Sequence, residues 1–166
     1  MSSLYQSKKT SPFHISAGAV LVNAEGKVLV HRRIKSEAPE QFANNFTARD
    51  EVYILMRESL EDGETIEEAV QRGVQEEFGM KCEVEKYLGS IQGTVPGKDG
   101  TWSWEKTTLY FQAKAGAACE RASDDESFSR LEWHDPEFLI ERMRGQGGVR
   151  PDLDESKILE AYVRYR

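Results

Sequence analysis

The stretch GETIEEAVQRGVQEEFG, residues 63–79, has the marks of a capped helix that ends in two adjacent carboxylates. Thr65, followed three residues later by Glu68, is typical of a capping box at the start of a helix. Apolar residues then recur at helical spacing, and Gly79 suits the left-handed position that follows a helix. The pattern predicts a helix across this stretch.

The two adjacent carboxylates at the end of this helix, Glu76 and Glu77, suggest a divalent metal site. In helical projection Glu77 falls near the apolar stripe, and Glu76 lies on its polar border. A carboxylate in such a place needs a cation or hydrogen-bond donors to offset its desolvation, and paired carboxylates suit magnesium or manganese. A second interpretation stays open, in which Glu76 pairs with Arg72 one turn earlier and Glu77 is solvated.

Residues 53–80 resemble the signature of the Nudix hydrolase family. That signature runs Gly, five residues, Glu, seven residues, and then Arg-Glu-apolar-any-Glu-Glu-any-Gly-apolar. Glu64 stands at its first Glu and Arg72 at its Arg, while Glu76 and Glu77 stand at the paired carboxylates. The order of these matches is specific to the family, whereas the rest of the chain resembles it in outline.

Two positions depart from the signature. Glu58 replaces the opening Gly, and Gly73 replaces the Glu that follows the Arg. The resemblance implies that a Glu at position 73 would ligate metal or act as the general base, so one carboxylate of the cluster is missing. We hypothesise that Glu58 supplies a replacement carboxylate from the loop side; the alternative is an ordinary surface Glu.

The activity implied by the resemblance is hydrolysis of a pyrophosphate bond in a nucleoside diphosphate linked to another group. Glu76 and Glu77 would hold magnesium or manganese, with Glu58 as our added ligand, and Arg72 would orient the carboxylates. Such a site neutralises the phosphate oxygens that repel an attacking water. One alternative is a Nudix module that binds a phosphorylated ligand with little or no turnover. Another is an unrelated structural or interaction domain.

No residue of the matched stretch is assigned as the general base. The resemblance implies an acidic residue from a loop before a late Trp-containing strand, and residues 124–126 precede Trp133 in that way. Glu126 is the preferred candidate, Asp125 the second, and Glu105 a weaker one. A solvated acidic loop is the alternative interpretation.

A small phosphorylated nucleotide-type ligand also needs cations and a stacking surface. Arg57 and Arg33 are the candidates for binding its phosphates, and Trp102 and Trp104 are the candidates for stacking on a nucleobase. The alternatives are a core position for each tryptophan and a strand end entering solvent for Arg33. Further candidates are Lys106 as a cation and Phe42, Phe46 and Tyr53 as stacking aromatics.

Apolar runs and turn residues predict the remaining elements. Residues 14–22 and 27–32 are strand-like, with a turn between them, so they predict a hairpin. Residues 34–50 show no clean period and indicate an irregular loop. We also expect strands over 52–55, 82–92 and 104–114, a helix from Asp135, a flexible break over 145–148 and a final helix capped by Asp154. This order is typical of an α/β fold, and the resemblance implies a Nudix-type α/β/α sandwich with a mixed sheet.

Composition bounds the overall organisation. A chain of 166 residues, 39% of them hydrophobic, can bury one core, so we expect a single Nudix-like domain over 1–166 with a flexible segment over 1–12. No apolar run reaches membrane-span length and no signal peptide is recognisable, so a cytoplasmic protein without a membrane partner is expected. The net charge of -7 argues against nucleic-acid polymers as partners. These features are compatible with a homodimer.

Overall fold

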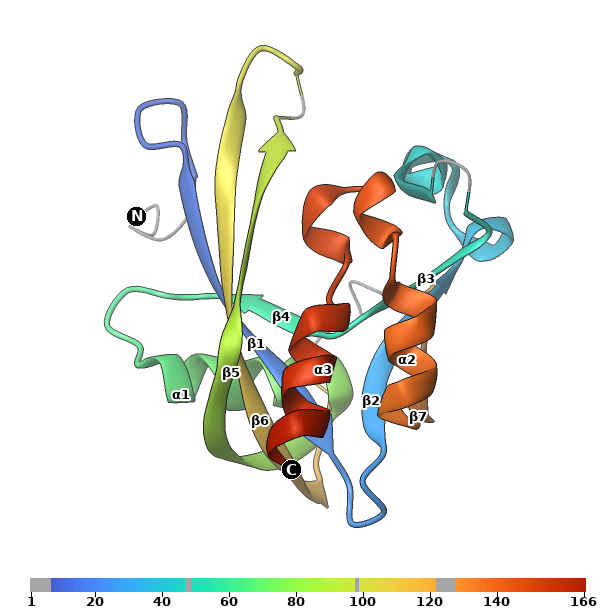
Figure 1. Cartoon of the computed structure of the whole chain (residues 1–166). Helices are drawn as coiled ribbons and strands as arrows, with labels where there is room; N and C mark the ends of the chain where they lie inside the picture. The colour runs from blue at the N-terminus through green and yellow to red at the C-terminus, as the bar shows by residue number, and fades with distance from the viewer. Residues whose placement is uncertain (1–6, 47–48, 98, 122–127) are drawn as a thin grey trace.

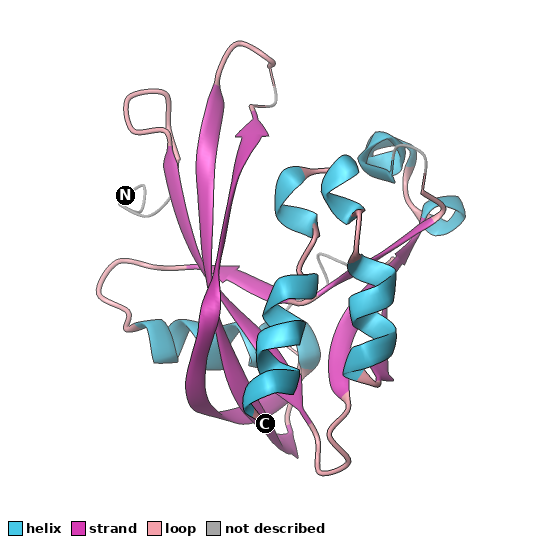
Figure 2. Cartoon of the chain, viewed as in Figure 1, coloured by secondary structure: helices cyan, strands magenta, loops and turns pink. Residues whose placement is uncertain are grey.

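The computed structural model describes residues 7–46, 49–97, 99–121 and 128–166. The fold of these residues is built on a mixed seven-stranded sheet (Figure 1). Within these described residues, three α-helices and four short 3-10 turns accompany the sheet (Figure 2). The strands are β1 (Phe13–Val22), β2 (Val28–Ile34), β3 (Glu51–Ile54), β4 (Met56–Ser59), β5 (Met80–Pro96), β6 (Ser103–Ala118) and β7 (Ser129–His134). The helices are α1 (Ile66–Phe78), α2 (Pro136–Met143) and α3 (Ser156–Tyr165). The 3-10 turns are η1 (Lys35–Glu37), η2 (Glu40–Phe46), η3 (Gln146–Gly148) and η4 (Pro151–Leu153).

The sheet opens between its first two strands, and this opening places the functional residues. β1 and β2 pair at Val22 and Val28, beside the predicted hairpin turn. Beyond that point the β3–β4 segment lies between them, because β3 bonds to β2 and β4 bonds to β1. β1 is also parallel to β6, and β2 is antiparallel to β7. Strand β5 completes the sheet as the antiparallel partner of β6.

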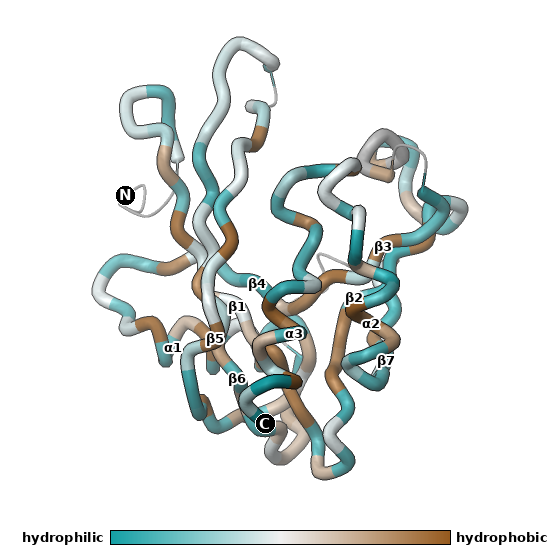
Figure 3. Tube along the Cα trace, viewed as in Figure 1, coloured by the Kyte–Doolittle hydropathy of each residue, from teal (hydrophilic) through white to brown (hydrophobic). Residues whose placement is uncertain are grey.

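Two apolar cores lie on opposite faces of the sheet. Along β1, Val20 belongs to the core that includes α2 and α3, whereas its neighbours Ala19 and Leu21 belong to the core that includes α1. This alternation follows from the period of two along a strand. Figure 1 shows α2 and α3 together, apart from α1, and Figure 3 shows hydrophobic residues along the central strands. The predicted α/β/α sandwich with a mixed sheet is confirmed.

Helix α1 forms where the sequence predicts it. The Thr65 side chain accepts a hydrogen bond from the Glu68 backbone, and the Glu68 side chain accepts one from the Thr65 backbone. Gly79 ends the helix in the left-handed conformation, with φ of 66°. Each of these signals acts between residues that are close in sequence, which explains why the prediction succeeded.

The segment over 145–148 corrects the predicted flexible break. Gln146 is fully buried there, and its amide accepts a hydrogen bond from the Tyr53 backbone N–H and donates to the carbonyls of Tyr53 and Leu153. Its side chain therefore takes the place of a neighbouring strand beside β3. Buried backbone groups need such partners, so this turn is tied to the sheet.

The other sequence predictions need smaller adjustments. The irregular stretch over 34–50 contains η1 and η2. Asp154 accepts a hydrogen bond from the Ser156 backbone, but the residue that precedes α3 is Glu155. Within the expected flexible N-terminal segment, residues 1–6 lie outside the described part of the chain, and Lys8 forms a β-bridge with Ser11. Among the described residues, no helix has the length and apolar character needed to cross a bilayer.

Candidate functional site

Helix α1 and strand β4 bring the predicted carboxylates together around Arg72. The Arg72 guanidinium donates to both carboxylate oxygens of Glu64, at 2.7 and 3.1 Å, and to the Ser59 carbonyl at 2.8 Å. Its third nitrogen lies 3.3 Å from Glu76 and 3.5 Å from Glu58. Arg72 thus joins the loop before α1 to the last turn of α1.

Gly73 is explained by the same contact between α1 and β4. A Cβ atom at position 73 would lie 2.6 Å from the sulfur of Met56 and 2.8 Å from the Cβ of Glu58. Such distances are far inside ordinary van der Waals contact. The close approach therefore requires glycine at this position, and the same approach holds Glu58 beside the end of α1.

Glu77 faces a different partner from Glu76. His31 on β2 donates through Nε2 to a Glu77 carboxylate oxygen at 2.8 Å, and the His31 side chain is almost fully buried. The two residues are 46 positions apart in sequence. No local pattern in the sequence links His31 to the helix, so this contact was not predicted.

Glu58, Glu76 and Glu77 fit a hard divalent cation by their chemistry. Burial raises the pKa of Glu58, and the negative charges of Glu77 and Glu76 raise it further against the opposing effect of Arg72. A bound cation would relieve this repulsion, and carboxylate oxygens are the ligands that magnesium prefers. Within the described part of the chain, however, no three Asp, Glu, His or Cys side chains are gathered closely enough to hold an ion. Glu77 is instead turned to His31, and the other two carboxylates to Arg72.

A polar recess of about 210 Å³ lies next to Glu77. Three arginines and one lysine line it, and Glu77 is the carboxylate among its described lining residues. The complete lining is His31, Arg33, Ile54, Leu55, Arg57, Glu77, Lys106 and Arg150. The candidates Arg33 and Arg57 therefore lie together, whereas Arg150 was not predicted from sequence. The concentration of positive charge suits a phosphate group.

Asp152 in η4 holds two of the recess arginines in position. Its carboxylate accepts a hydrogen bond from Arg57 at 2.7 Å and two from Arg150, at 2.5 and 2.9 Å. Burial alone would raise the pKa of Asp152, but the hydrogen bonds from Arg150 and the charge of Arg57 hold it well below its usual value. Asp152 is therefore ionised, and it orients both guanidinium groups.

A second buried carboxylate supports Arg57 from the other side. Glu155 is fully buried, accepts hydrogen bonds from the Leu55 backbone and from the Tyr110 hydroxyl, and lies 3.8 Å from the Arg57 guanidinium. Leu55 is the residue between β3 and β4. The interaction thus stabilises the chain at the opening of the sheet, where Arg57 enters the recess.

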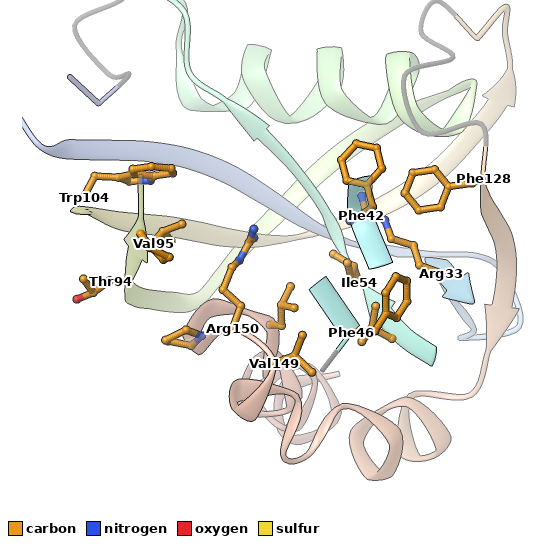
Figure 4. A pocket seen from close by; sticks show the side chains of 14 residues that line it. Arg33, Phe42, Phe46, Ile54, Thr94, Val95, Trp104, Phe128, Val149 and Arg150 are labelled. Carbon is orange, nitrogen blue, oxygen red and sulfur yellow. The ribbon is translucent and has the colours of Figure 1, made fainter. Parts of the chain in front are cut away.

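An apolar chamber of about 720 Å³ adjoins the recess (Figure 4). The two cavities share Arg33, Ile54 and Arg150. The chamber is lined by Arg33, Phe42, Phe46, Val52, Ile54, Thr94, Val95, Pro96, Trp104, Phe128, Val149, Arg150, Pro151 and Leu153. The predicted aromatic candidates Phe42, Phe46 and Trp104 are therefore part of it, and Tyr53 belongs to the core instead.

Trp102 is separated from the chamber. Its ring packs against Trp104 with centroids 5.5 Å apart, and both rings line a shallow hollow with Ser7 and Asp99. The two rings are therefore adjacent, but Trp102 lies in the loop before β6, and of the two only Trp104 also lines the chamber.

The candidates for the general base have different outcomes. Glu126 and Asp125 lie outside the described residues. Glu105 on β6 accepts a hydrogen bond from the Thr94 hydroxyl at 2.8 Å and does not line the recess. The base therefore stays a prediction for Glu126, with Asp125 second.

Comparison with known proteins agrees with this architecture. A family model for the NUDIX domain matches residues 12–152. A MutT-like protein from Streptomyces ambofaciens is 30% identical over 146 residues, which is 87% of this chain and 79% of that protein. The solution structure of the E. coli ORF135 protein matches with a TM-score of 0.59 and 18% identity, and a NUDIX hydrolase from Nitrosomonas europaea matches with 0.62 and 19%. Each match covers 90% of this chain and 88% of the other. The chain belongs to the NUDIX family of hydrolases.

Proposed function

We propose that this protein hydrolyses a pyrophosphate bond in a nucleoside diphosphate linked to another group, with magnesium or manganese as the cofactor. Pyrophosphate-bond hydrolysis is the general activity of the family; the substrate class and the metal are our proposal. The observation that carries it is the position of Glu77, which lies between the carboxylates at the end of α1 and the cationic recess. A diphosphate in this position would contact both.

Each side of the site has its own part in the proposed reaction. Glu76, Glu77 and Glu58 would hold the cation, which would supply charge neutralisation and a more acidic bound water. His31 orients Glu77, and Arg72 orients Glu76. In the recess, Arg57 and Arg33 bind the phosphate oxygens, and Asp152 fixes the direction of Arg57.

The nucleobase and the base catalyst complete the proposal. Trp102 and Trp104 form a half-buried pair beside a shallow hollow, in which a nucleobase can stack on them. Glu126 would accept the proton of the attacking water. The proposed ligand is thus a small phosphorylated molecule, and a cytoplasmic location and a homodimer stay predictions from the sequence.

A binding module with weak turnover is the second candidate, and Gly73 favours it. Position 73 has no room for a side chain, so the family's usual carboxylate cannot be restored there without moving β4. Catalysis therefore depends on a base from elsewhere in the chain. The two candidates differ in turnover and agree in ligand binding.

A substrate survey tests the proposed function. Hydrolysis of ADP-glucose, diadenosine tetraphosphate and ATP would be followed by phosphorus NMR, with magnesium, with manganese and with EDTA. We expect metal-dependent cleavage of the pyrophosphate bond, fastest with ADP-glucose, because the recess suits one diphosphate rather than a longer chain. Binding of ADP-glucose without cleavage of any of the three would contradict the enzyme and support the binding module.

Lys106 makes ligand binding dependent on pH. Burial lowers the pKa of Lys106 to about 7, with a further decrease from Arg57 and Arg150 that Asp152 and Glu155 oppose. The charged form that attracts phosphate is therefore lost as the pH rises through 7. We expect the affinity for ADP-glucose, whose phosphates do not titrate here, to fall on the order of tenfold between pH 6.5 and 8.5 in calorimetry at constant magnesium.

The matched variants separate Lys106 from general effects of pH. Lys106→Met should flatten the profile, whereas Lys114→Met, an exposed lysine on the same strand, should leave it unchanged. The effect of rising pH on folding stability has the opposite sign to its effect on ligand affinity. Because the folded pKa lies below the unfolded value of 10.5, Lys106 opposes folding fully below pH 7, and this cost disappears as the pH rises towards 10.5. A profile in Lys106→Met as steep as in the wild type would refute the assignment.

A further inference from the structure

The apolar chamber beside the cationic recess has a chemical character of its own. The rings of Phe42 and Phe128 stack with centroids 5.4 Å apart and planes at 24° (Figure 4). Phe46, Ile54 and Val95 are buried residues of its wall. Its volume lies within the range of about 300–1,000 Å³ that is typical of small-molecule sites.

Most polar side chains of the chamber are already engaged within the protein; the exception is Trp104, whose buried indole N–H has no hydrogen-bond partner among the described residues. Arg33 donates to Ser129 and lies over the Phe128 ring, and Arg150 is bound to Asp152. The Thr94 hydroxyl donates to Glu105. No Asp, Glu, Asn or Gln side chain is among the described residues that line the chamber. A sugar placed there would lose hydrogen bonds to water without gaining comparable ones from these side chains.

The two arginines shared by both cavities give the direction of the ligand. Arg33 and Arg150 lie where the chamber meets the recess, next to Ile54. A diphosphate bound in the recess would therefore continue into the chamber through the group that it carries. This group would contact aromatic and aliphatic carbon on several sides.

We infer that the group linked to the diphosphate of the substrate is apolar, an alkyl or aryl group bound in the chamber by Phe42 and Phe128. This inference rests on the proposed function and specifies it. The nucleoside lies outside the chamber. Selectivity comes from the apolar area removed from water, so a hydrocarbon group is preferred over a sugar of equal size.

A matched pair of ligands tests this inference. The β-hexyl ester of ADP and ADP-glucose have the same nucleoside diphosphate and six-carbon groups of opposite polarity. In calorimetry with magnesium, we expect the hexyl ester to bind on the order of tenfold tighter or better, since two or three well-buried methylene groups suffice for that difference. Equal affinities, or tighter binding of ADP-glucose, would overturn the inference.

Variants of the chamber test whether its side chains cause the preference for the hexyl ester over ADP-glucose. The double variant Phe42→Ala/Phe128→Ala should lose most of the preference, so that the ratio of its affinities for the hexyl ester and ADP-glucose approaches one. Phe13→Ala is the control, because Phe13 is an exposed phenylalanine that does not line the chamber. A preference that survives the double variant would refute the assignment to the chamber. Circular dichroism would verify that all variants are folded.

The same measurements distinguish this inference from the proposed function. Preferential binding of the hexyl ester without cleavage of either ligand would refute the proposed hydrolysis and leave the chamber assignment intact. Cleavage of both ligands with equal affinity would support hydrolysis and overturn the assignment. Binding and turnover therefore report on the two proposals separately.

Discussion

Glu77→Gln is expected to lower metal-dependent hydrolysis of ADP-glucose by at least about 100-fold. The substitution keeps the size of the side chain and an oxygen that can accept from His31, so the helix end should be preserved. It removes the negative charge that a divalent cation requires, at the place where α1 meets the recess. Initial rates would measure the loss of turnover, and calorimetry would measure the loss of magnesium binding.

The control for Glu77 is Glu67→Gln on the same helix. Glu67 is exposed and does not line the recess, so its substitution removes the same charge without touching the site. We expect its turnover to stay within about twofold of the wild type, because an exposed charge contributes little. A Glu77→Gln protein as active as Glu67→Gln would show that the carboxylate has no part in catalysis.

Gly73→Glu is expected to destabilise the protein by about 3 kcal/mol or more, instead of restoring the missing carboxylate. Replacing a helical glycine contributes about 1 kcal/mol in favour of folding. Against this gain stand the overlap of the new Cβ with Met56 and Glu58 and the placement of another carboxylate among like charges. The unfavourable effects are larger, so the sign is destabilising.

Urea unfolding would measure this change, with Gly148→Glu as the control. Gly148 is exposed, and a Cβ built there meets no atom within 4 Å, so the same substitution should change the free energy of unfolding by less than about 0.5 kcal/mol. A stable Gly73→Glu protein with increased turnover would mean that β4 moves away readily. The explanation of Gly73 by close packing would then be wrong.

Different ranges of interaction explain which parts of the fold were predictable. The capping box of α1 and the turn before β2 depend on hydrogen bonds between residues at most four positions apart, such as that from Lys27 to Asn23. Gln146 shows the opposite case. Four residues rich in glycine indicated a flexible break, but a partner 93 positions away holds the glutamine in the core.

The residues of the candidate site also differ in whether near or distant parts of the sequence bring them together. Glu76, Glu77 and Arg72 are neighbours on one helix, so sequence spacing places them together. The contact of His31 with Glu77 spans 46 positions, and the contact of Arg57 with Asp152 spans 95. No local pattern indicated Asp152 or Arg150, although both shape the recess.

The family, the central helix and the paired carboxylates were predictable from the sequence, because they depend on ordered motifs and helical periodicity. The reason for glycine at position 73 became visible in the three-dimensional structure alone, because it is a strand that packs against the helix at Met56 and Glu58. The three-dimensional structure also shows that Phe42 and Trp104, from distant segments, line one chamber. Packing between remote segments depends on the whole chain, so no short stretch of sequence contains it.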